Sequence, residues 1–422
     1  MPAEALGEPV LVAGSSAGTE LWRSDRGWML KRNGEEFLIK GVGGHERLAD
    51  AAALGANSIR TWDGENIGWL LDEAASNNLL VTVGIWLEHP RHGFDYADPT
   101  SRAKQLEKIK RIVTQYRDHP AVLMWAAGNE VELMIEADAE LAKAWRSVEE
   151  GAALIKQLDP TRPVLAIVSE LGWGGEKVKA VAERCPSVDI IGINSYGGAA
   201  NLATRYLELG HDLPYILTEF GTLGPWEVGQ TSWGAPYEPT STEKADRYAA
   251  AYAENVGGDR AEGHCLGTYA FVWGHKQEAT GTWFGMLLET GEMTASAEAA
   301  SMSWTGKMPK QRAPVIEKLH VDVDLEDVKR GRAFEARIDA HDPNGDPLDV
   351  AWEVRRESSD RRAGGDAEAV PELMEGKIVS ADGLTATVRA SDQPGAYRLF
   401  AVVRDGTGRA GTANVPFRIV DE

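Results

Sequence analysis

Val122-Leu-Met-Trp-Ala-Ala-Gly-Asn-Glu130 is the stretch of sequence that decides the fold. It opens with six apolar residues in a row, a pattern typical of a strand buried on both faces of a parallel sheet. A second such run, Pro214-Tyr-Ile-Leu-Thr-Glu219, also closes on a glutamate. Barrel enzymes carry their chemistry at the C-terminal ends of such strands. Glu130 and Glu219 therefore predict two carboxylates that face each other across a pocket.

Apolar runs alternate with helix-like segments from about Trp28 to Trp304. The six other runs are Phe37–Gly44, Ala56–Asp63, Leu79–His89, Pro163–Glu170, Val188–Gly198 and Gly267–His275. Amphipathic stretches such as Asp98–Arg117 and Ala137–Leu158 lie between the runs. Eight strands alternating with helices over about 275 residues predict an α/β fold, a closed (β/α)8 TIM barrel. A doubly wound open sheet is disfavoured, because Gly41-Val-Gly-Gly44 lacks the spacing of a phosphate-binding fingerprint.

A different pattern begins after Pro309-Lys-Gln-Arg-Ala-Pro314. Short alternating runs are separated by turn motifs such as Asp342-Pro-Asn-Gly-Asp-Pro347 and Asp405-Gly-Thr-Gly408. About seven such runs in about 105 residues predict a small all-β sandwich, which resembles the PKD or cadherin-like immunoglobulin-fold domains. We therefore expect an N-terminal segment at residues 1–27, the barrel at 28–308 and the sandwich at 314–422.

Composition narrows the classes of partner. The chain has 44 basic and 65 acidic residues and a net charge of −21, which argues against nucleic acid or an anionic membrane as partner. No apolar run is long enough to cross a bilayer. Met1-Pro-Ala-Glu4 does not begin a signal peptide. We expect a secreted or periplasmic protein in trimmed form, with a cytoplasmic protein as the alternative, and the oligomeric state stays open.

The predicted barrel resembles the clan A glycoside hydrolases, in particular the TIM-barrel catalytic domain of glycoside hydrolase family 2 and its relatives in family 5. Gly128-Asn129-Glu130 matches the Asn-Glu pair at the end of the clan's fourth strand. Thr218-Glu219-Phe220-Gly221 matches the nucleophile segment that ends the seventh strand. Leu158-Asp-Pro-Thr-Arg-Pro-Val164 resembles a common family 2 entry to the fifth strand. The resemblance implies that Glu130 is the general acid/base and Glu219 the nucleophile.

The expected chemistry gives the two carboxyl groups different requirements. A retaining hydrolase needs one protonated carboxyl for the leaving oxygen and one carboxylate for the anomeric carbon, roughly 5–5.5 Å apart. Glu130 must keep its proton near neutral pH, so burial or a nearby negative charge must raise its pKa. Glu219 must stay ionised, which favours cationic and hydroxyl neighbours.

The expected function is therefore a retaining β-glycosidase that acts on a β-glucan or a related oligo- or polysaccharide. A transglycosylase would use the same two glutamates, because only the acceptor differs. A non-catalytic carbohydrate-binding barrel is the less favoured alternative, since both carboxylates are present.

Four further positions match the sugar site of the clan. Arg60, at the end of the second strand, would lie near the nucleophile. Asn129 would hydrogen-bond the sugar 2-hydroxyl, and Tyr196 would donate a hydrogen bond to the nucleophile. Trp273, on the eighth strand, would lie under the sugar at the cleaved bond.

Histidines at strand ends add candidates for lining the site. His45 follows the first strand, and His89 follows the third together with Trp86. A metal-dependent barrel hydrolase would need a His-x-His pair on the first strand, where only His45 is found. Asp342 and Asp346 are interpreted as turn formers rather than calcium ligands. We expect no metal and no cofactor.

The loop after Glu219 is long and rich in aromatic residues, and long loops in compact domains are usually functional. We predict that its Trp226 and Trp233 stack on sugar rings, and the alternative is that they pack the loop onto the barrel. Only about 27 residues precede the barrel, where family 2 enzymes carry β-domains. This departure puts the usual exo-acting assignments of family 2 in doubt. The long aromatic loop would suit a groove for an oligosaccharide, and the choice between endo and exo action stays open.

Overall fold

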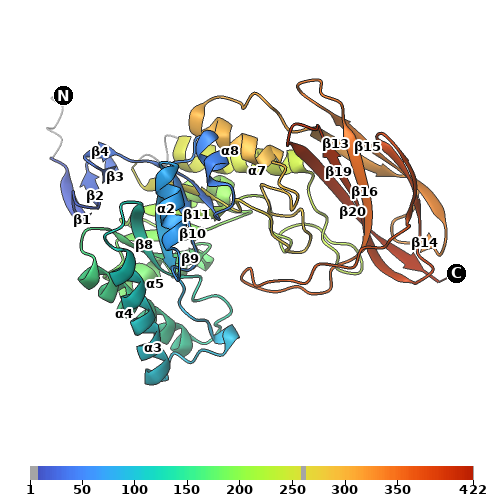
Figure 1. The fold of residues 1–422 in the computed structure, drawn as a ribbon. Helices are drawn as coiled ribbons and strands as arrows, with labels where there is room; N and C mark the ends of the chain where they lie inside the picture. Colours follow the sequence, from blue (N-terminus) through green and yellow to red (C-terminus); the bar gives the residue numbers. More distant parts are fainter. Residues whose placement is uncertain (1–7, 258–262, 422) are drawn as a thin grey trace. The chain divides into compact units, whose positions relative to one another are not determined.

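The structure is a computed structural model that describes residues 8–257 and 263–421 (Figure 1). The chain divides into two compact units. One unit runs up to Phe220 and includes Ala251–Ala270, and the other comprises Gly221–Ala250 and the chain from Phe271 onward. The second unit therefore joins segments of the predicted barrel to the predicted sandwich, a grouping that does not follow the order of the sequence.

The first unit is built on a closed barrel, which confirms the predicted TIM-barrel fold. In the part of the chain that the structure describes, eight parallel strands pair in chain order around it. They are β5 (Ile39–Gly43), β6 (Ser58–Arg60), β7 (Leu80–Ile85), β8 (Val122–Asn129), β9 (Val164–Ser169), β10 (Ile190–Asn194), β11 (Tyr215–Phe220) and β12 (Cys265–Ala270). β8 and β11 are buried along their whole lengths, as expected for barrel strands covered on both faces.

Helices follow most of the strands. They are α1 (Leu48–Ala53), α2 (Gly68–Ser76), α3 (Pro99–Tyr116), α4 (Asp138–Leu158), α5 (Glu176–Arg184), α6 (Leu202–Glu208), α7 (Ser241–Tyr252) and α8 (Ala295–Thr305), with short helical turns η1 (Pro90–His92), η2 (Trp173–Gly175), η3 (Ala199–Asn201) and η4 (Ala253–Gly257). The side chain of Asp98 caps α3 by accepting from the N–H groups of Thr100 and Ser101. Among the described residues, no helix has both the length and the apolar character needed to span a membrane.

An antiparallel sheet precedes the barrel and was not anticipated from the sequence. It comprises β1 (Val10–Gly14), β2 (Thr19–Ser24), β3 (Gly27–Arg32) and β4 (Glu35–Glu36). Its Leu21 and Leu30 share a buried cluster with Ile39, Leu123 and Ile190, which lie near the starts of barrel strands. The sheet thus covers the end of the barrel where the strands begin.

The C-terminal part of the second unit is a β-sandwich, as predicted. Within the continuously described stretch 263–421, two four-stranded sheets have the orders β13-β15-β18-β17 and β14-β20-β19-β16. The strands are β13 (Val315–Val321), β14 (Val328–Lys329), β15 (Ala333–His341), β16 (Asp349–Arg356), β17 (Ile378–Asp382), β18 (Thr385–Arg389), β19 (Gly395–Arg404) and β20 (Ala410–Val420). Phe334, Trp352, Val388, Tyr397 and Phe417 belong to its core.

Candidate active site

The end of β8 is shaped to present Glu130. The pairing register with β9 shifts between Ala126 and Asn129, so the strand is bulged just before the glutamate. Gly128 has φ +83°, and a Cβ atom there would lie 2.9 Å from Val131 Cγ1. Glu130 itself has φ 50°, a conformation that non-glycine residues seldom adopt. The bulge therefore turns the Glu130 side chain away from the regular alternation of the strand.

Glu219 lies on β11 and accepts three hydrogen bonds. Arg60 Nη1 and Trp62 Nε1 donate to its Oε1 at 2.9 and 2.7 Å. Tyr196 donates to Oε2 at 2.9 Å. Every one of these partners is a donor and one is a cation, so both oxygens of the Glu219 carboxylate are held in place.

Arg60 links the ends of three barrel strands. It ends β6, its side chain is fully buried, and Nη1 also donates to the Thr218 carbonyl at 2.8 Å. Its Nη2 donates to Asn129 Oδ1 at 2.5 Å. One guanidinium group thus holds both Glu219 and Asn129, and it brings together three residues that the sequence predicted separately.

Asn194, at the end of β10, connects the two glutamates. Its Nδ2 donates to Glu130 Oε1 at 2.8 Å and lies 3.1 Å from Asn129 Oδ1. Its Oδ1 accepts from Thr218 Oγ1 at 2.8 Å, and Thr218 precedes Glu219. A chain of hydrogen bonds therefore runs from Glu130 to β11, the strand that carries Glu219.

Sequence reasoning did not single out Asn194 or Trp62. Asn194 ends β10, two residues before Tyr196, and Trp62 follows the end of β6 by two residues. Polar or aromatic residues at the C-terminal ends of barrel strands are candidates for a site, and that pattern marks both positions.

Burial and nearby negative charge raise the pKa of Glu130 to about 8. Loss of hydration is the main cause, followed by the charges of Glu219 and Glu132. The hydrogen bond from Asn194 and the charge of Arg60 act in the opposite direction but are outweighed. Glu130 is therefore mostly protonated at neutral pH, the state that a general acid requires.

Three other residues predicted to line the site also lie near the ends of barrel strands. His89 is fully buried beyond β7, and its ring centroid lies 4.8 Å from that of Trp86. His45 is exposed and meets Trp69 edge to face at 5.7 Å. The role of these three residues in sugar binding stays a prediction.

Three predicted tryptophans belong to the second unit. Trp273 is 1% exposed, whereas Trp226 is 60% exposed. Trp233 is partly buried, and the Arg418 guanidinium lies 5.2 Å from its ring centroid. Their part in binding sugar at the two glutamates also stays a prediction.

Part of the barrel matches a known protein family. Residues 63–254 match the family described as glycosyl hydrolases family 2, TIM barrel domain. Glu130 and Glu219 both lie inside the matched range. The match confirms the resemblance to family 2 that the two glutamate motifs indicate.

Curated relatives are similar to parts of the chain. Beta-glucuronidase from Homo sapiens is 27% identical over 39% of this chain and 26% of its own length. A probable mannan endo-1,4-beta-mannosidase C from Aspergillus terreus is 31% identical over 26% of this chain and 29% of its own. The chain thus spans about a quarter of the length of these relatives.

Solved structures support the fold. Beta-glucuronidase 2 from Bacteroides uniformis superposes with a TM-score of 0.51 and 14% identity, over 96% of this chain and 49% of that one. The beta-glucuronidase from Bifidobacterium dentium has a TM-score of 0.51 and 18% identity, over 71% of this chain and 50% of that one. At these identities the likeness is one of fold.

Proposed function

We propose that this chain is a retaining glycoside hydrolase that cleaves β-glycosidic bonds in a β-glucan or a related neutral oligo- or polysaccharide. The observation that carries the proposal is the contrast between two carboxyl groups at barrel strand ends. Glu130 has its pKa raised to about 8, while Glu219 accepts from Arg60, Trp62 and Tyr196. One group is suited to give a proton and the other to attack.

The first step of the proposed reaction forms a glycosyl–enzyme ester. A carboxylate oxygen of Glu219 attacks the anomeric carbon, and the bond from that carbon to the leaving oxygen breaks. The leaving oxygen keeps the electron pair and takes the proton of Glu130. The negative charge of Glu219 is lost in the ester, so one of the causes that raise the pKa of Glu130 is removed.

The second step releases the sugar. Glu130, now ionised, accepts a proton from a water molecule as the water oxygen bonds to the anomeric carbon. The ester bond breaks and Glu219 regains its negative charge. Arg60, 2.9 Å from Glu219 Oε1 and fully buried, stabilises the carboxylate as it returns.

Asn129 is oriented to bind a sugar hydroxyl. Its Oδ1 accepts from Arg60 at 2.5 Å and from Asn194 at 3.1 Å. Because these two donors fix the amide orientation, the NH2 group is the part of the side chain that is offered to a ligand. A hydrogen bond to the 2-hydroxyl that strengthens in the transition state would contribute to the rate.

The charges around the glutamates favour a neutral sugar. Glu130, Glu132 and Glu219 are near enough for the charges of the last two to raise the pKa of the first. The guanidinium of Arg60 is already engaged by Glu219, Asn129 and a backbone carbonyl. A uronic acid would therefore meet repulsion from the carboxylates, while the Arg60 guanidinium is already engaged.

A substrate panel tests the proposal. The chain is incubated with β-glucans, mannans and xylans and with activated aryl β-glycosides, and the products are identified. We expect hydrolysis of at least one neutral substrate, and proton NMR of the first product should find the β-anomer. Formation of the α-anomer would contradict the retaining mechanism, and longer oligosaccharides among the products would indicate transglycosylation.

Azide rescue tests the two roles separately. Glu219→Ala is expected to abolish turnover of the aryl glycoside. Azide should restore turnover, with the α-glycosyl azide as the product. Glu130→Ala with azide is expected to yield the β-glycosyl azide, because Glu219 still forms the ester. Undiminished activity of Glu219→Ala would overturn the assignment of the nucleophile.

A further inference from the structure

We propose that the second unit carries its own sugar-binding pocket, formed by the loop after β11 and the loop between β16 and β17 of the sandwich. The ligand is one sugar unit of a neutral β-linked oligosaccharide, a class that rests on the proposed function. The sandwich then takes part in binding carbohydrate through residues 357–368.

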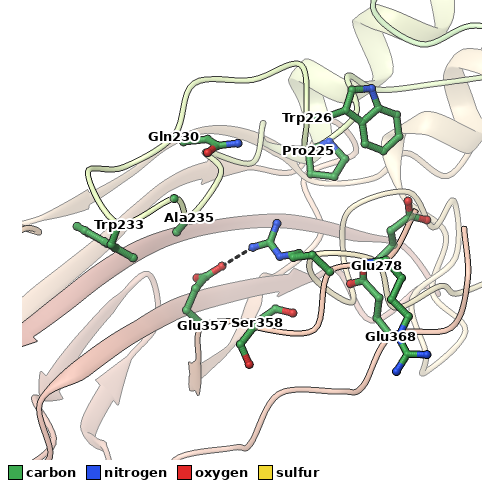
Figure 2. A pocket seen from close by; sticks show the side chains of 13 residues that line it. Pro225, Trp226, Gln230, Trp233, Ala235, Glu278, Glu357, Ser358 and Glu368 are labelled. Carbon is green, nitrogen blue, oxygen red and sulfur yellow. Dashed lines mark hydrogen bonds and ion pairs between the residues drawn. The ribbon is translucent and has the colours of Figure 1, made fainter. Parts of the chain in front are cut away.

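A cavity of about 380 Å³ lies between these two loops. Its volume is within the roughly 300–1,000 Å³ that is common for small-molecule sites. Figure 2 shows Pro225 and Trp226 along one side, with Glu357, Ser358 and Glu368 along the other. Both loops belong to the second unit, so the pocket is complete within it.

The loop after β11 supplies an apolar platform. Trp226 lines the cavity with 60% of its surface exposed, a large exposure for so apolar a side chain. Its ring centroid lies 6.4 Å from that of the buried Phe284, which supports one part of the indole. Sugar rings have apolar C–H faces, so an indole held in this way is suited to stack on one.

The sandwich loop supplies polar groups that are already held in place. Glu357 forms an ion pair with Arg398, with contacts of 2.8 and 2.9 Å, and a second one with Arg361 at 3.0 Å. The dashed line in Figure 2 marks an ion pair formed by Glu357. Glu368 accepts from the N–H groups of Arg362 and Ala279 at 3.0 and 2.7 Å. These groups can offer donors and acceptors to hydroxyls with little reorganisation.

The charge of the pocket fits a neutral ligand. Three carboxylates, Glu278, Glu357 and Glu368, line it together with the guanidinium groups of Arg361 and Arg362. The formal sum is −1, and each of the two arginines is engaged by a carboxylate. An anionic sugar would gain no unpaired cation here, whereas hydroxyl groups can bind to either kind of group.

A buried polar network holds the two loops together. Glu238, near the end of the aromatic loop, accepts from Lys244 at 2.5 Å and from Asn414 of the sandwich at 2.6 Å. Arg398, the partner of Glu357, donates to the Pro236 carbonyl at 2.8 Å. Both walls of the pocket are therefore tied to the same buried cluster, and the cavity is preorganised rather than formed by the ligand.

Binding measured in an inactive background tests the proposal. The full chain with Glu219→Ala is titrated by calorimetry with cellohexaose, laminarihexaose, mannohexaose and xylohexaose. We expect Trp226→Ala to weaken binding of the best ligand by about tenfold, because the stacking platform is lost. Ser358→Trp, which fills the cavity from the opposite wall, is expected to weaken it similarly.

Trp173→Ala is the matched control, since Trp173 is 96% exposed and lies in the first unit. It should bind as the parent does, and thermal melts check that all variants are folded. Unchanged affinity in both pocket variants, or no binding of any of the four hexasaccharides, would overturn the proposal.

Different experimental outcomes would contradict the pocket and the proposed hydrolysis. If the wild type hydrolyses aryl β-glycosides but the pocket variants bind oligosaccharide as tightly as the parent, the pocket proposal is wrong and the proposed activity stands. If those variants bind more weakly but the wild type hydrolyses no glycoside, the pocket proposal stands and the proposed activity is wrong.

Discussion

Asn194 Nδ2 lies 2.8 Å from Glu130 Oε1 and donates a hydrogen bond to it. Asn194 also accepts from Thr218, the residue before Glu219, so it orients Glu130 relative to the strand that carries Glu219. The hydrogen bond favours the ionised form of Glu130 and opposes the burial that raises its pKa. Asn194 is thus a positioning residue that also limits how far this pKa rises.

Asn194→Ala should raise the pKa of Glu130 further and leave its carboxyl poorly oriented. We expect kcat to fall by about 10²-fold, the range seen when one oriented hydrogen-bond donor is removed from a site. The basic limb of the profile of kcat/KM against pH should move above that of the wild type. Asn77→Ala, at the exposed end of α2, is the control. An unchanged profile would contradict the role of Asn194.

The wild type should lose the proposed hydrolytic activity as the pH rises through about 8. The pKa of Glu130 is raised to about 8, and only the protonated form can give a proton to the leaving oxygen. The charge of Glu132 contributes to that shift, so Glu132→Gln should move the basic limb to lower pH. The profile of kcat/KM for an aryl glycoside measures both effects. A limb at the same pH in the two proteins would show that Glu132 does not act on Glu130.

Arg60→Lys should reduce kcat by about 10²- to 10³-fold, because an ammonium group cannot hold Glu219, Asn129 and the Thr218 carbonyl together. Steady-state kinetics on the aryl glycoside measure the loss. Arg102→Lys is a matched control, since Arg102 pairs with Glu150 between α3 and α4. If Arg60→Lys kept activity within twofold of the wild type, the contacts of the guanidinium with all three acceptors would be unnecessary.

Glu130→Gln should stabilise the fold increasingly as the pH rises. The folded-state pKa of Glu130 is about 8 against a usual 4.5, so the folded protein holds a proton that the unfolded chain releases between these values. The stability of the wild type therefore falls as the pH rises from about 4.5 to about 8, and a neutral glutamine avoids this loss. Thermal melts at pH 5, 6.5 and 8 measure the widening difference in Tm. Glu107→Gln, at an exposed position, should show no such trend.

Lys244→Met should destabilise the second unit by about 3–5 kcal/mol, because it leaves Glu238 as a buried charge without its cation. The double variant Glu238→Gln/Lys244→Met should recover much of this loss. Urea unfolding measures both. Equal destabilisation in the single and double variants would mean that the lost contacts with Thr280, Thr282 and Asn414 matter more than the charge.

Much of the fold follows from local patterns in the sequence. The apolar runs that end at Glu130 and Glu219 predict β8 and β11, because a strand buried on both faces consists of consecutive apolar residues. Asp98 followed by Pro99 predicts the start of α3 for the same local reason. The sheet at residues 10–36 escaped prediction, since its strands are short and carry many charged residues.

The partners of the two glutamates lie far away along the chain. Trp62 reaches Glu219 across 157 residues, and Asn194 reaches Glu130 across 64. Neither contact is implied by the residues beside it, although both residues lie near strand ends. The grouping of residues 221–250 with the sandwich is likewise a long-range result, which depends on the buried contacts of Glu238 and Arg398.

The sequence by itself determined the barrel, the sandwich and the positions of Glu130 and Glu219 at strand ends, because apolar periodicity and turn residues act over a few neighbours. Only the tertiary structure decided that the pKa of Glu130 is raised to about 8. The pKa of a carboxyl group depends on its burial and on charges from distant segments, and here those come from Glu219, Glu132 and Arg60. The two glutamates have similar sequence surroundings, but the groups packed around each of them differ and give them different chemical properties.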